Sequence, residues 1–222
     1  MLTEIKICGL SDEEGVDAAL DAGADFVGFN FFPPSPRHIA LDGAVGLAAR
    51  ARGRARVVAV IVDADDALLS AIANALRPDF LQLHGSETPA RVTAVRLLTG
   101  LPVMKALGIS GRSDVAAIDG YGGEADRFLL DAKPPRDASR PGGNATAFDW
   151  TLLDGFSCRR PWLLAGGLGA ENVAAALAAT TAQGVDVSSG VESAPGRKDP
   201  ALIHAFVRAV RAFDRPSRRM AG

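Results

Sequence analysis

Residues 4–10 read EIKICGL, a short apolar run of the β type that stops at Cys8. A second run of this kind, RFLLDAK at 127–133, carries Asp131 near its end. In a closed barrel of parallel strands, the carboxyl ends of the strands meet at one rim, where the active sites of that fold lie. The two runs therefore predict an enzyme in which a thiol and a carboxyl group face one substrate, provided that the rest of the chain forms such a barrel.

The rest of the chain repeats one pattern eight times. Short runs rich in Val, Ile, Leu and Phe alternate with longer, Ala-rich amphipathic runs, as expected for a parallel sheet that helices cover. We expect strands at 4–8, 25–31, 56–62, 79–84, 102–107, 127–132, 161–166 and 184–189. We expect helices near 12–22, 42–52, 65–76, 88–99, 112–119, 149–155, 170–179 and 199–213. This count predicts an α/β fold, a single (β/α)8 TIM barrel, whereas the alternative, a doubly wound open sheet, usually has five or six strands.

The chain shows no internal domain boundary. We expect residues 1–213 to form one catalytic barrel domain and residues 214–222, which read DRPSRRMAG, to form a polar, frayed C-terminal tail. With 222 residues, of which 48% are hydrophobic, the chain is long enough to bury a sizeable core.

Composition argues against several kinds of partner. The formal net charge is only −2, so no global basic field would recruit nucleic acid or an anionic membrane. No apolar stretch reaches the roughly 18 residues of a membrane span, and the start MLTEIKICGL does not resemble a signal peptide. Neither Cys8 nor Cys158 has a second cysteine at zinc-binding spacing. We expect a cytoplasmic protein without a metal.

Glycines follow the seventh predicted strand, in LLAGGLGAEN at 163–172, and VSSGVES at 187–193 repeats the device after the eighth. Glycines let backbone N–H groups approach an anion closely, and barrel enzymes often bind phosphate between these two loops. We therefore expect a phosphate site near Gly166, Gly167, Ser189 and Gly190. The alternative is that these glycines only make tight turns.

Two further side chains follow predicted strands. Arg37 closes PPSPR at 33–37, where three prolines stiffen the loop. A guanidinium held in this way suits a carboxylate or a second phosphate, although a surface arginine in a turn would have the same sequence. His84 in LQLHG is either a ligand contact or a rim histidine with partners in the protein.

The thiol and the carboxyl group also have structural interpretations. A free cysteine is most often a small buried hydrophobic residue, and Asp131 alone could be a helix cap or a salt-bridge partner. At a reference pKa near 8.5, only about 3% of a thiol is ionised at pH 7. A nearby cation or a helix N-terminus would have to raise that fraction if Cys8 is to act as a base.

With these residues in place, the chain resembles the phosphoribosylanthranilate isomerase family of tryptophan biosynthesis. The resemblance covers nearly the whole length, and its motifs occur in the order of the family. They are KICGL at 6–10, GFNFFPPSPRHI at 28–39, LQLHG at 81–85, LLDAKPP at 129–135, FDW at 148–150, LAGGL at 164–168, and VDVSSGVES with PGRKD at 185–199.

The resemblance implies a (β/α)8 barrel and a cofactor-free Amadori rearrangement of N-(5-phosphoribosyl)anthranilate, a small-molecule phosphosugar. It makes Cys8 the general base and Asp131 the general acid, and Arg37 the contact of the anthranilate carboxylate. The substrate phosphate would rest on the backbone near Gly166, Gly167, Ser189 and Gly190. From its position after the fourth strand, we also expect His84 to contact the substrate. We expect a monomer or a homodimer.

Two other functions remain open at this point. Another phosphosugar isomerase or epimerase on the same fold, including the bifunctional isomerase shared with histidine synthesis, would usually bring a carboxylate pair or metal ligands to the rim. A non-catalytic barrel that binds phosphate ligands would show binding without turnover.

Overall fold

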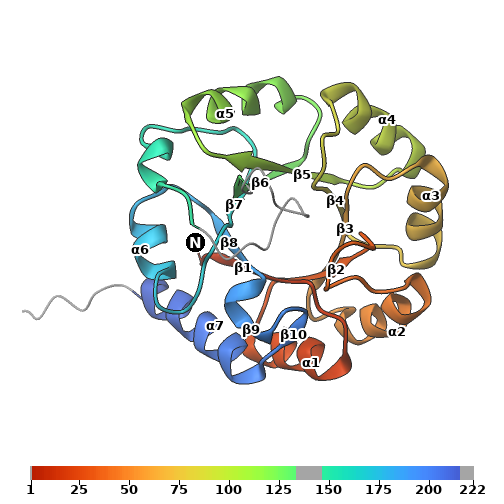
Figure 1. The fold of residues 1–222 in the computed structure, drawn as a ribbon, viewed down its shortest axis with the longest axis horizontal. Helices are drawn as coiled ribbons and strands as arrows, with labels where there is room; N and C mark the ends of the chain where they lie inside the picture. Colours follow the sequence, from red (N-terminus) through yellow and green to blue (C-terminus); the bar gives the residue numbers. More distant parts are fainter. Residues whose placement is uncertain (1, 134–146, 216–222) are drawn as a thin grey trace, which may run out of the picture.

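The chain forms a closed barrel of eight parallel strands, each hydrogen-bonded to the next, with the last paired to the first (Figure 1). The computed structural model describes residues 2–133 and 147–215. The strands are β1 (Glu4–Cys8), β2 (Phe26–Asn30), β3 (Arg56–Ile61), β4 (Phe80–Leu83), β5 (Val103–Ile109), β6 (Arg127–Ala132), β7 (Trp162–Leu164) and β8 (Gly184–Val187). Closure of the sheet confirms the predicted (β/α)8 barrel and excludes the open doubly wound sheet.

Helices form a ring around the strands (Figure 1). They are α1 (Glu13–Ala22), α2 (Leu41–Ala51), α3 (Asp66–Ala75), α4 (Pro89–Thr99), α5 (Arg112–Ala116), α6 (Val173–Ala178) and α7 (Pro200–Asp214), with the 3₁₀ turns η1 (Ala117–Tyr121), η2 (Trp150–Leu153) and η3 (Ser189–Val191). The helix expected at 149–155 is only the four-residue turn η2. Asp149 caps it, and Gly155 with φ 73° follows two residues beyond its end. The segment is therefore too short to nucleate an α-helix.

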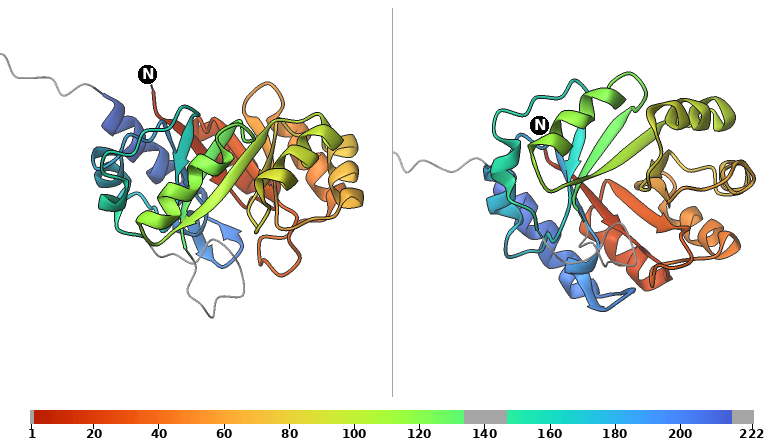
Figure 2. Two further views of the ribbon diagram at one scale, coloured as in Figure 1. Left: turned by 90° about the horizontal axis from the view of Figure 1, so that it is seen from above. Right: turned by 45° about the horizontal axis from the view of Figure 1, so that its top comes forward.

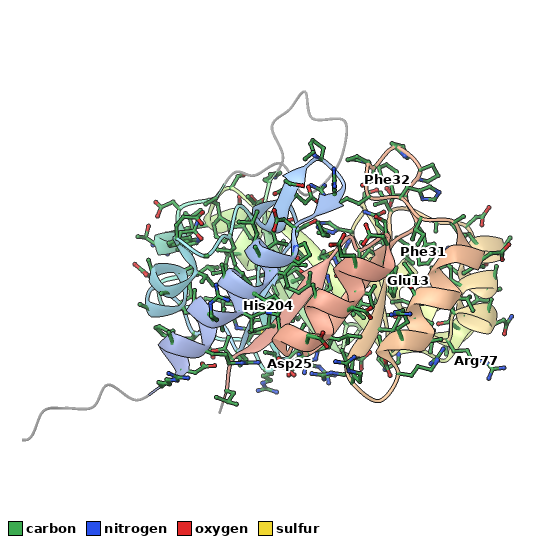
Figure 3. All side chains as sticks on the ribbon, turned by 90° about the horizontal axis from the view of Figure 1, so that it is seen from below. Glu13, Asp25, Phe31, Phe32, Arg77 and His204 are labelled. Carbon is green, nitrogen blue, oxygen red and sulfur yellow. The ribbon has the colours of Figure 1, made fainter. Side chains whose placement is uncertain are left out.

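An antiparallel hairpin, which the sequence pattern did not reveal, separates β8 from α7. Its strands are β9 (Glu192–Ala194) and β10 (Arg197–Lys198). A Cβ at Gly196 would lie only 2.3 Å from the carbonyl oxygen of Pro36, so the hairpin packs closely against the loop that follows β2. Figure 2 shows the hairpin at the end of the barrel opposite to the amino terminus, and Figure 3 shows Phe32 at that same end, with Asp25 and Arg77 at the other.

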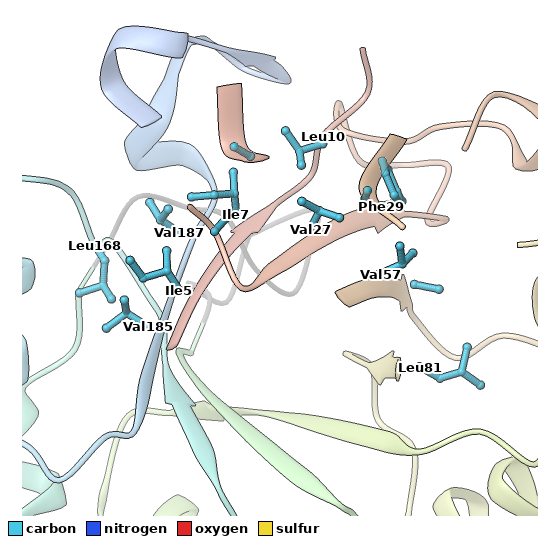
Figure 4. Close-up of a cluster of buried hydrophobic side chains, with 14 of the residues drawn as sticks. Ile5, Ile7, Leu10, Val27, Phe29, Val57, Leu81, Leu168, Val185 and Val187 are labelled. Carbon is cyan, nitrogen blue, oxygen red and sulfur yellow. The ribbon is translucent and has the colours of Figure 1, made fainter. Parts of the chain in front are cut away.

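Side chains alternate between the two faces of each strand. On β1, Ile5 and Ile7 belong to the large apolar cluster between the strands and the helices (Figure 4), and both are fully buried. Lys6 and Cys8 therefore point into the barrel. Most of the barrel interior is apolar, but it also contains a set of buried polar side chains: Lys6, Gln82, Lys105 and Asp186. One of these polar residues, Asp186, also lines the cavity at the carboxyl rim, where the predicted site lies.

The C-terminal helix is tied to the start of the chain. Asp214 accepts hydrogen bonds from the backbone N–H of Thr3 at 3.2 Å and from its hydroxyl at 2.6 Å. Most of the tail expected at 214–222 lies outside the described residues, so the domain limits stay a prediction. Within the described residues, no helix is both long and apolar enough to cross a membrane.

Phe206 provides a test of how α7 is packed. Its side chain is fully buried in the core, so Phe206→Ala should lower the free energy of unfolding by about 3–5 kcal/mol. Phe213→Ala, on the same helix but 42% exposed, is the control and should cost about 1 kcal/mol or less. Equal losses in chemical denaturation would contradict this description of the core.

Candidate active site at the carboxyl rim

A cavity of about 670 Å³, including open solvent at its mouth, lies at the carboxyl rim of the barrel. Side chains and backbone from many of the strand ends line it: Cys8, Asn30, Phe32, Ser35, Arg37, Val60, Val62, His84, Asp131, Ala165, Gly166, Gly167, Leu168, Asp186, Ser188 and Ser189. All the site residues expected from the sequence are among them except Gly190, which packs against Leu168 at the edge. The thiol of Cys8 and the carboxyl group of Asp131 therefore face one cavity, as expected from their positions at the ends of two strands.

Cys8 ends β1 with its side chain inside the barrel and 8% of its surface exposed. It pairs with Gly28 of β2, where a Cβ would lie 3.1 Å from the Cys8 Sγ and 3.2 Å from the Lys6 Nζ. Glycine at this position leaves room for both groups. Burial is the largest influence on the thiol and raises its pKa above the ordinary value, although Lys6 and Lys198 act in the opposite direction. The resting side chain is therefore mainly a protonated thiol at neutral pH.

Lys6 and Asp186 form an ion pair directly beneath Cys8, with 2.7 Å between Nζ and Oδ1. Burial alone would lower the pKa of Lys6, but the Asp186 carboxylate and the thiol outweigh it and raise that pKa above its usual range. Neither residue was predicted from the sequence as part of the site. The spacing of Lys6 and Cys8 on one strand, which puts both on the same face, was the signal that could have revealed Lys6.

Asp131 lies near the end of β6 and is buried, with 9% of its side chain exposed. Its Oδ1 accepts a hydrogen bond from the N–H of Ala132 at 2.8 Å, and its Oδ2 lies 3.3 Å from the His84 Nε2. The Gln82 side-chain nitrogen lies 3.0 Å from the other ring nitrogen of His84. An amide nitrogen can only donate, so this placement of the Gln82 amide assigns the ring proton to Nε2, the nitrogen that faces Asp131. His84 thus lines the cavity and also contacts the carboxyl group.

Arg37 is 4% exposed and holds a carboxylate of its own chain. Its Nε and Nη2 donate to the two carboxylate oxygens of Glu192, at 2.7 and 2.8 Å. Lys198 donates to the same carboxylate at 2.7 Å. Burial raises the pKa of Glu192, but Arg37 and Lys198 outweigh it and lower that pKa below its usual value. The hairpin β9–β10 therefore fixes the guanidinium at the edge of the cavity, a role that the sequence did not reveal.

The loops after β7 and β8 approach each other closely. Gly166 and Gly167 have φ values of 89° and 58°, which end β7 earlier than the sequence pattern indicated. A Cβ at Gly166 would lie 2.6 Å from the backbone nitrogen of Ala132, and a Cβ at Gly190 would lie 1.9 Å from the carbonyl oxygen of Leu168. Among the described residues, no protein acceptor is found for the N–H groups of Gly166 and Gly167. This geometry suits a bound anion.

The described residues contain no group of three or more His, Cys, Asp or Glu side chains placed to hold a metal ion.

The carboxyl rim of this (β/α)8 barrel carries a thiol, a carboxyl group and two glycine loops. Because the active sites of (β/α)8 enzymes lie at this rim, the arrangement is that of a (β/α)8 barrel enzyme. Comparison with known proteins is more specific. The family model described as N-(5'phosphoribosyl)anthranilate (PRA) isomerase matches residues 5–209. The chain belongs to this family.

Individual relatives in this family align with nearly the whole chain. The N-(5'-phosphoribosyl)anthranilate isomerase of Rhodopseudomonas palustris is 56% identical over 212 residues, covering 96% of this chain and 100% of the relative. That of Rhizobium meliloti is 58% identical over 211 residues, covering 95% and 98%. Among solved structures, phosphoribosyl anthranilate isomerase from Thermotoga maritima superposes with a TM-score of 0.85 at 32% identity, covering 96% and 100%.

A second solved structure of such an isomerase contains reduced 1-(o-carboxyphenylamino)-1-deoxyribulose 5-phosphate. It superposes with a TM-score of 0.83 at 30% identity, covering 95% of this chain and 100% of the other.

The contact between the two glycine loops gives a testable consequence. Gly190→Ala would push the loops apart, because no Cβ fits beside the Leu168 carbonyl. We expect the affinity for inorganic phosphate, measured by titration calorimetry, to fall about tenfold or more, a loss of about 1.4 kcal/mol. Gly46→Ala, where a Cβ would meet nothing within 4 Å, is the control and should leave that affinity unchanged. Unaltered phosphate binding by Gly190→Ala would contradict the anion site.

Proposed function

We propose that this chain converts N-(5-phosphoribosyl)anthranilate to 1-(2-carboxyphenylamino)-1-deoxyribulose 5-phosphate, with Asp131 as the general acid and Cys8 as the general base. As a member of its family, the chain is an isomerase of tryptophan biosynthesis. The observation on which the assignment of roles rests is that Cys8 and Asp131, 123 positions apart in the chain, line one cavity beside the glycine loops.

The first step needs an acid. Protonated Asp131 gives its proton to the ribose ring oxygen, the bond from that oxygen to C1 breaks, and the nitrogen lone pair forms a protonated Schiff base at C1. The N–H of Ala132 donates to one carboxyl oxygen, and the His84 Nε2 lies 3.3 Å from the other. A positioned acid of this kind contributes typically about 10²–10⁴-fold to the rate.

The second step needs a base. The cation at C1 acidifies the hydrogen on C2, and the Cys8 thiolate removes it to give an enolamine, which tautomerises to the ketone. Because burial raises the pKa of the thiol, the active thiolate is a minor form at neutral pH. Activity that depends on it should therefore rise as the pH rises towards that pKa.

Binding uses the two ends of the substrate. We assign the phosphate to the backbone near Gly166, Gly167, Ser189 and Gly190, and the anthranilate carboxylate to Arg37. Glu192 accepts hydrogen bonds from the Nε and Nη2 of Arg37, so the guanidinium is held in one orientation at the edge of the cavity, where the substrate carboxylate would approach it. His84 is a candidate contact on the same side as Asp131.

The setting in the cell is also a proposal. We infer that the enzyme works in the cytoplasm as a monomer or a homodimer. Support comes from the two cysteines, Cys8 and Cys158, which are both free thiols and suit a reducing compartment. One solved relative, from Thermotoga maritima, is described as a dimeric enzyme from which monomers were generated.

Replacing the two reactive groups tests the assigned roles. Cys8→Ser and Asp131→Asn should each lower turnover by about 10²–10⁴-fold, with little loss of phosphate affinity. The measurement is the loss of fluorescence of the anthranilate-linked substrate. Cys158→Ser is the matched control, because this half-buried thiol lies before β7, away from the cavity. A Cys8→Ser enzyme with more than a tenth of the parent turnover would contradict the base role, and binding without turnover by the parent chain would favour a non-catalytic barrel.

Arg37→Ala should act mainly on binding. Losing hydrogen bonds to a charged group costs about 1.5–3 kcal/mol, so we expect KM to rise by about one to two orders of magnitude while kcat changes less. Thermal unfolding should be measured alongside, because the change also removes the partner of buried Glu192. Arg50→Ala, a partly exposed arginine paired with Asp17, is the control. An unchanged KM for Arg37→Ala would defeat the assignment.

A further inference from the structure

Lys6 precedes Cys8 by two positions on β1, so both side chains lie on the same face of the strand and point into the barrel. Lys6 is the deeper of the two, because Cys8 is at the carboxyl end of the strand. Its side chain is fully buried, where an ammonium group is stable only with a negative partner or several acceptors. Asp186 supplies that partner. The two residues face each other in the register between β1 and β8, and Oδ1 accepts from Nζ at 2.7 Å.

The ammonium group and the thiol converge on one point. A Cβ at Gly28 would lie within 3.2 Å of the Lys6 Nζ and within 3.1 Å of the Cys8 Sγ. The charge of Lys6 also acts on the thiol, since it lowers the pKa of Cys8. A side chain at position 28 would therefore crowd both groups.

A second buried lysine in the barrel, Lys105, differs from Lys6 in the number of oxygen acceptors around its ammonium group. Lys105 is also paired at 2.7 Å, with Glu87, and it donates to the backbone oxygens of Leu83 and Gly85 as well. Its three N–H donors are thus all used by oxygen acceptors. For Lys6, Asp186 is the one oxygen acceptor found among the described residues, so donor capacity remains for the sulfur above it.

We propose that Lys6 is a positioning residue for the base: held by Asp186, its ammonium group supplies the counter-ion and the hydrogen bond of the Cys8 thiolate. The inference rests on the proposed function, because it explains how the thiol can serve as the base. Without Lys6, removing the thiol proton would leave two negative groups, the thiolate and Asp186, side by side in a buried site.

The direction of the effect on pH dependence follows from the charges around Cys8. Facing it are Lys6 on β1, Asp186 on β8 and Lys198 on β10, with Lys6 the largest influence that lowers the thiol pKa against burial. Asp131 on β6 and Arg37 line the same cavity. The thiolate forms as the pH rises through this pKa. Loss of Lys6 must therefore move thiolate formation to higher pH, and loss of Asp186 must move it to lower pH.

The test measures the rate at which iodoacetamide alkylates Cys8 as a function of pH, in a Cys158→Ser background so that one thiol reacts. Lys6→Met should slow alkylation at pH 7 about tenfold or more, which corresponds to a pKa shift of one unit or more. Lys6→Arg, which retains the charge, should stay close to the parent. Lys105→Met removes the other fully buried lysine and should leave the alkylation profile unchanged, whatever it does to stability.

Asp186→Asn supplies an independent arm if Lys6→Met does not fold. Asp186→Asn should accelerate alkylation at pH 7, the opposite of the effect expected for Lys6→Met. If the ion pair had only a structural role, the two substitutions would not change the alkylation rate in opposite directions. An unchanged profile in folded Lys6→Met, or unchanged or slower alkylation in Asp186→Asn, would overturn the inference.

The alkylation readout does not depend on turnover. In Lys6→Met the rising limb of kcat/KM with pH should shift by the same amount as the alkylation profile. If Cys8→Ser retains turnover, the proposed base role fails, and this inference fails with it. If Cys8→Ser is inactive but alkylation is unaltered by Lys6→Met, only the role of Lys6 fails.

Discussion

Lys6 on β1 and Asp186 on β8 pair across the seam where the last strand of the barrel meets the first. The pair joins residues that are 180 positions apart in the chain. Breaking a buried pair of this kind by removing one partner typically costs about 3–5 kcal/mol. This one ion pair therefore links the two strands that close the barrel. It also sets the charges that surround the Cys8 thiol.

Three glycines allow close approaches in the rest of the site. Gly28 leaves space for Lys6 and Cys8, and Gly166 lets its loop pass beside Asp131. Gly190 brings the eighth loop against the seventh. These glycines shape the cavity beside the thiol and the carboxyl group, where we propose that the phosphate and the sugar bind. Charged side chains from the hairpin β9–β10 complete the opposite edge by holding Arg37.

Much of this arrangement was predictable from the sequence, because parallel strands buried on both faces are continuous apolar runs and their ends converge. The sequence therefore sufficed to place Cys8 and Asp131 on one rim. It did not reveal the partners of charged groups inside the barrel, because the lateral pairing of Lys6 with Asp186 depends on closure. The role of Glu192 escaped notice because β9 and β10 have only three and two residues, too few for a periodic pattern. The sequence pattern predicts a helix where the turn η2 lies, because a turn of four residues is also too short to show a distinct periodicity.

We propose that one phosphosugar lies between Cys8 and Asp131 with its phosphate on the glycine loops. A crystal structure of this protein with reduced 1-(o-carboxyphenylamino)-1-deoxyribulose 5-phosphate would test this arrangement. We expect the phosphate at the backbone of Gly166, Gly167 and Gly190, with C2 of the sugar within about 4 Å of the Cys8 Sγ, close to the separation of reacting atoms. A ligand whose phosphate lies elsewhere, or whose C2 faces away from the thiol, would contradict it.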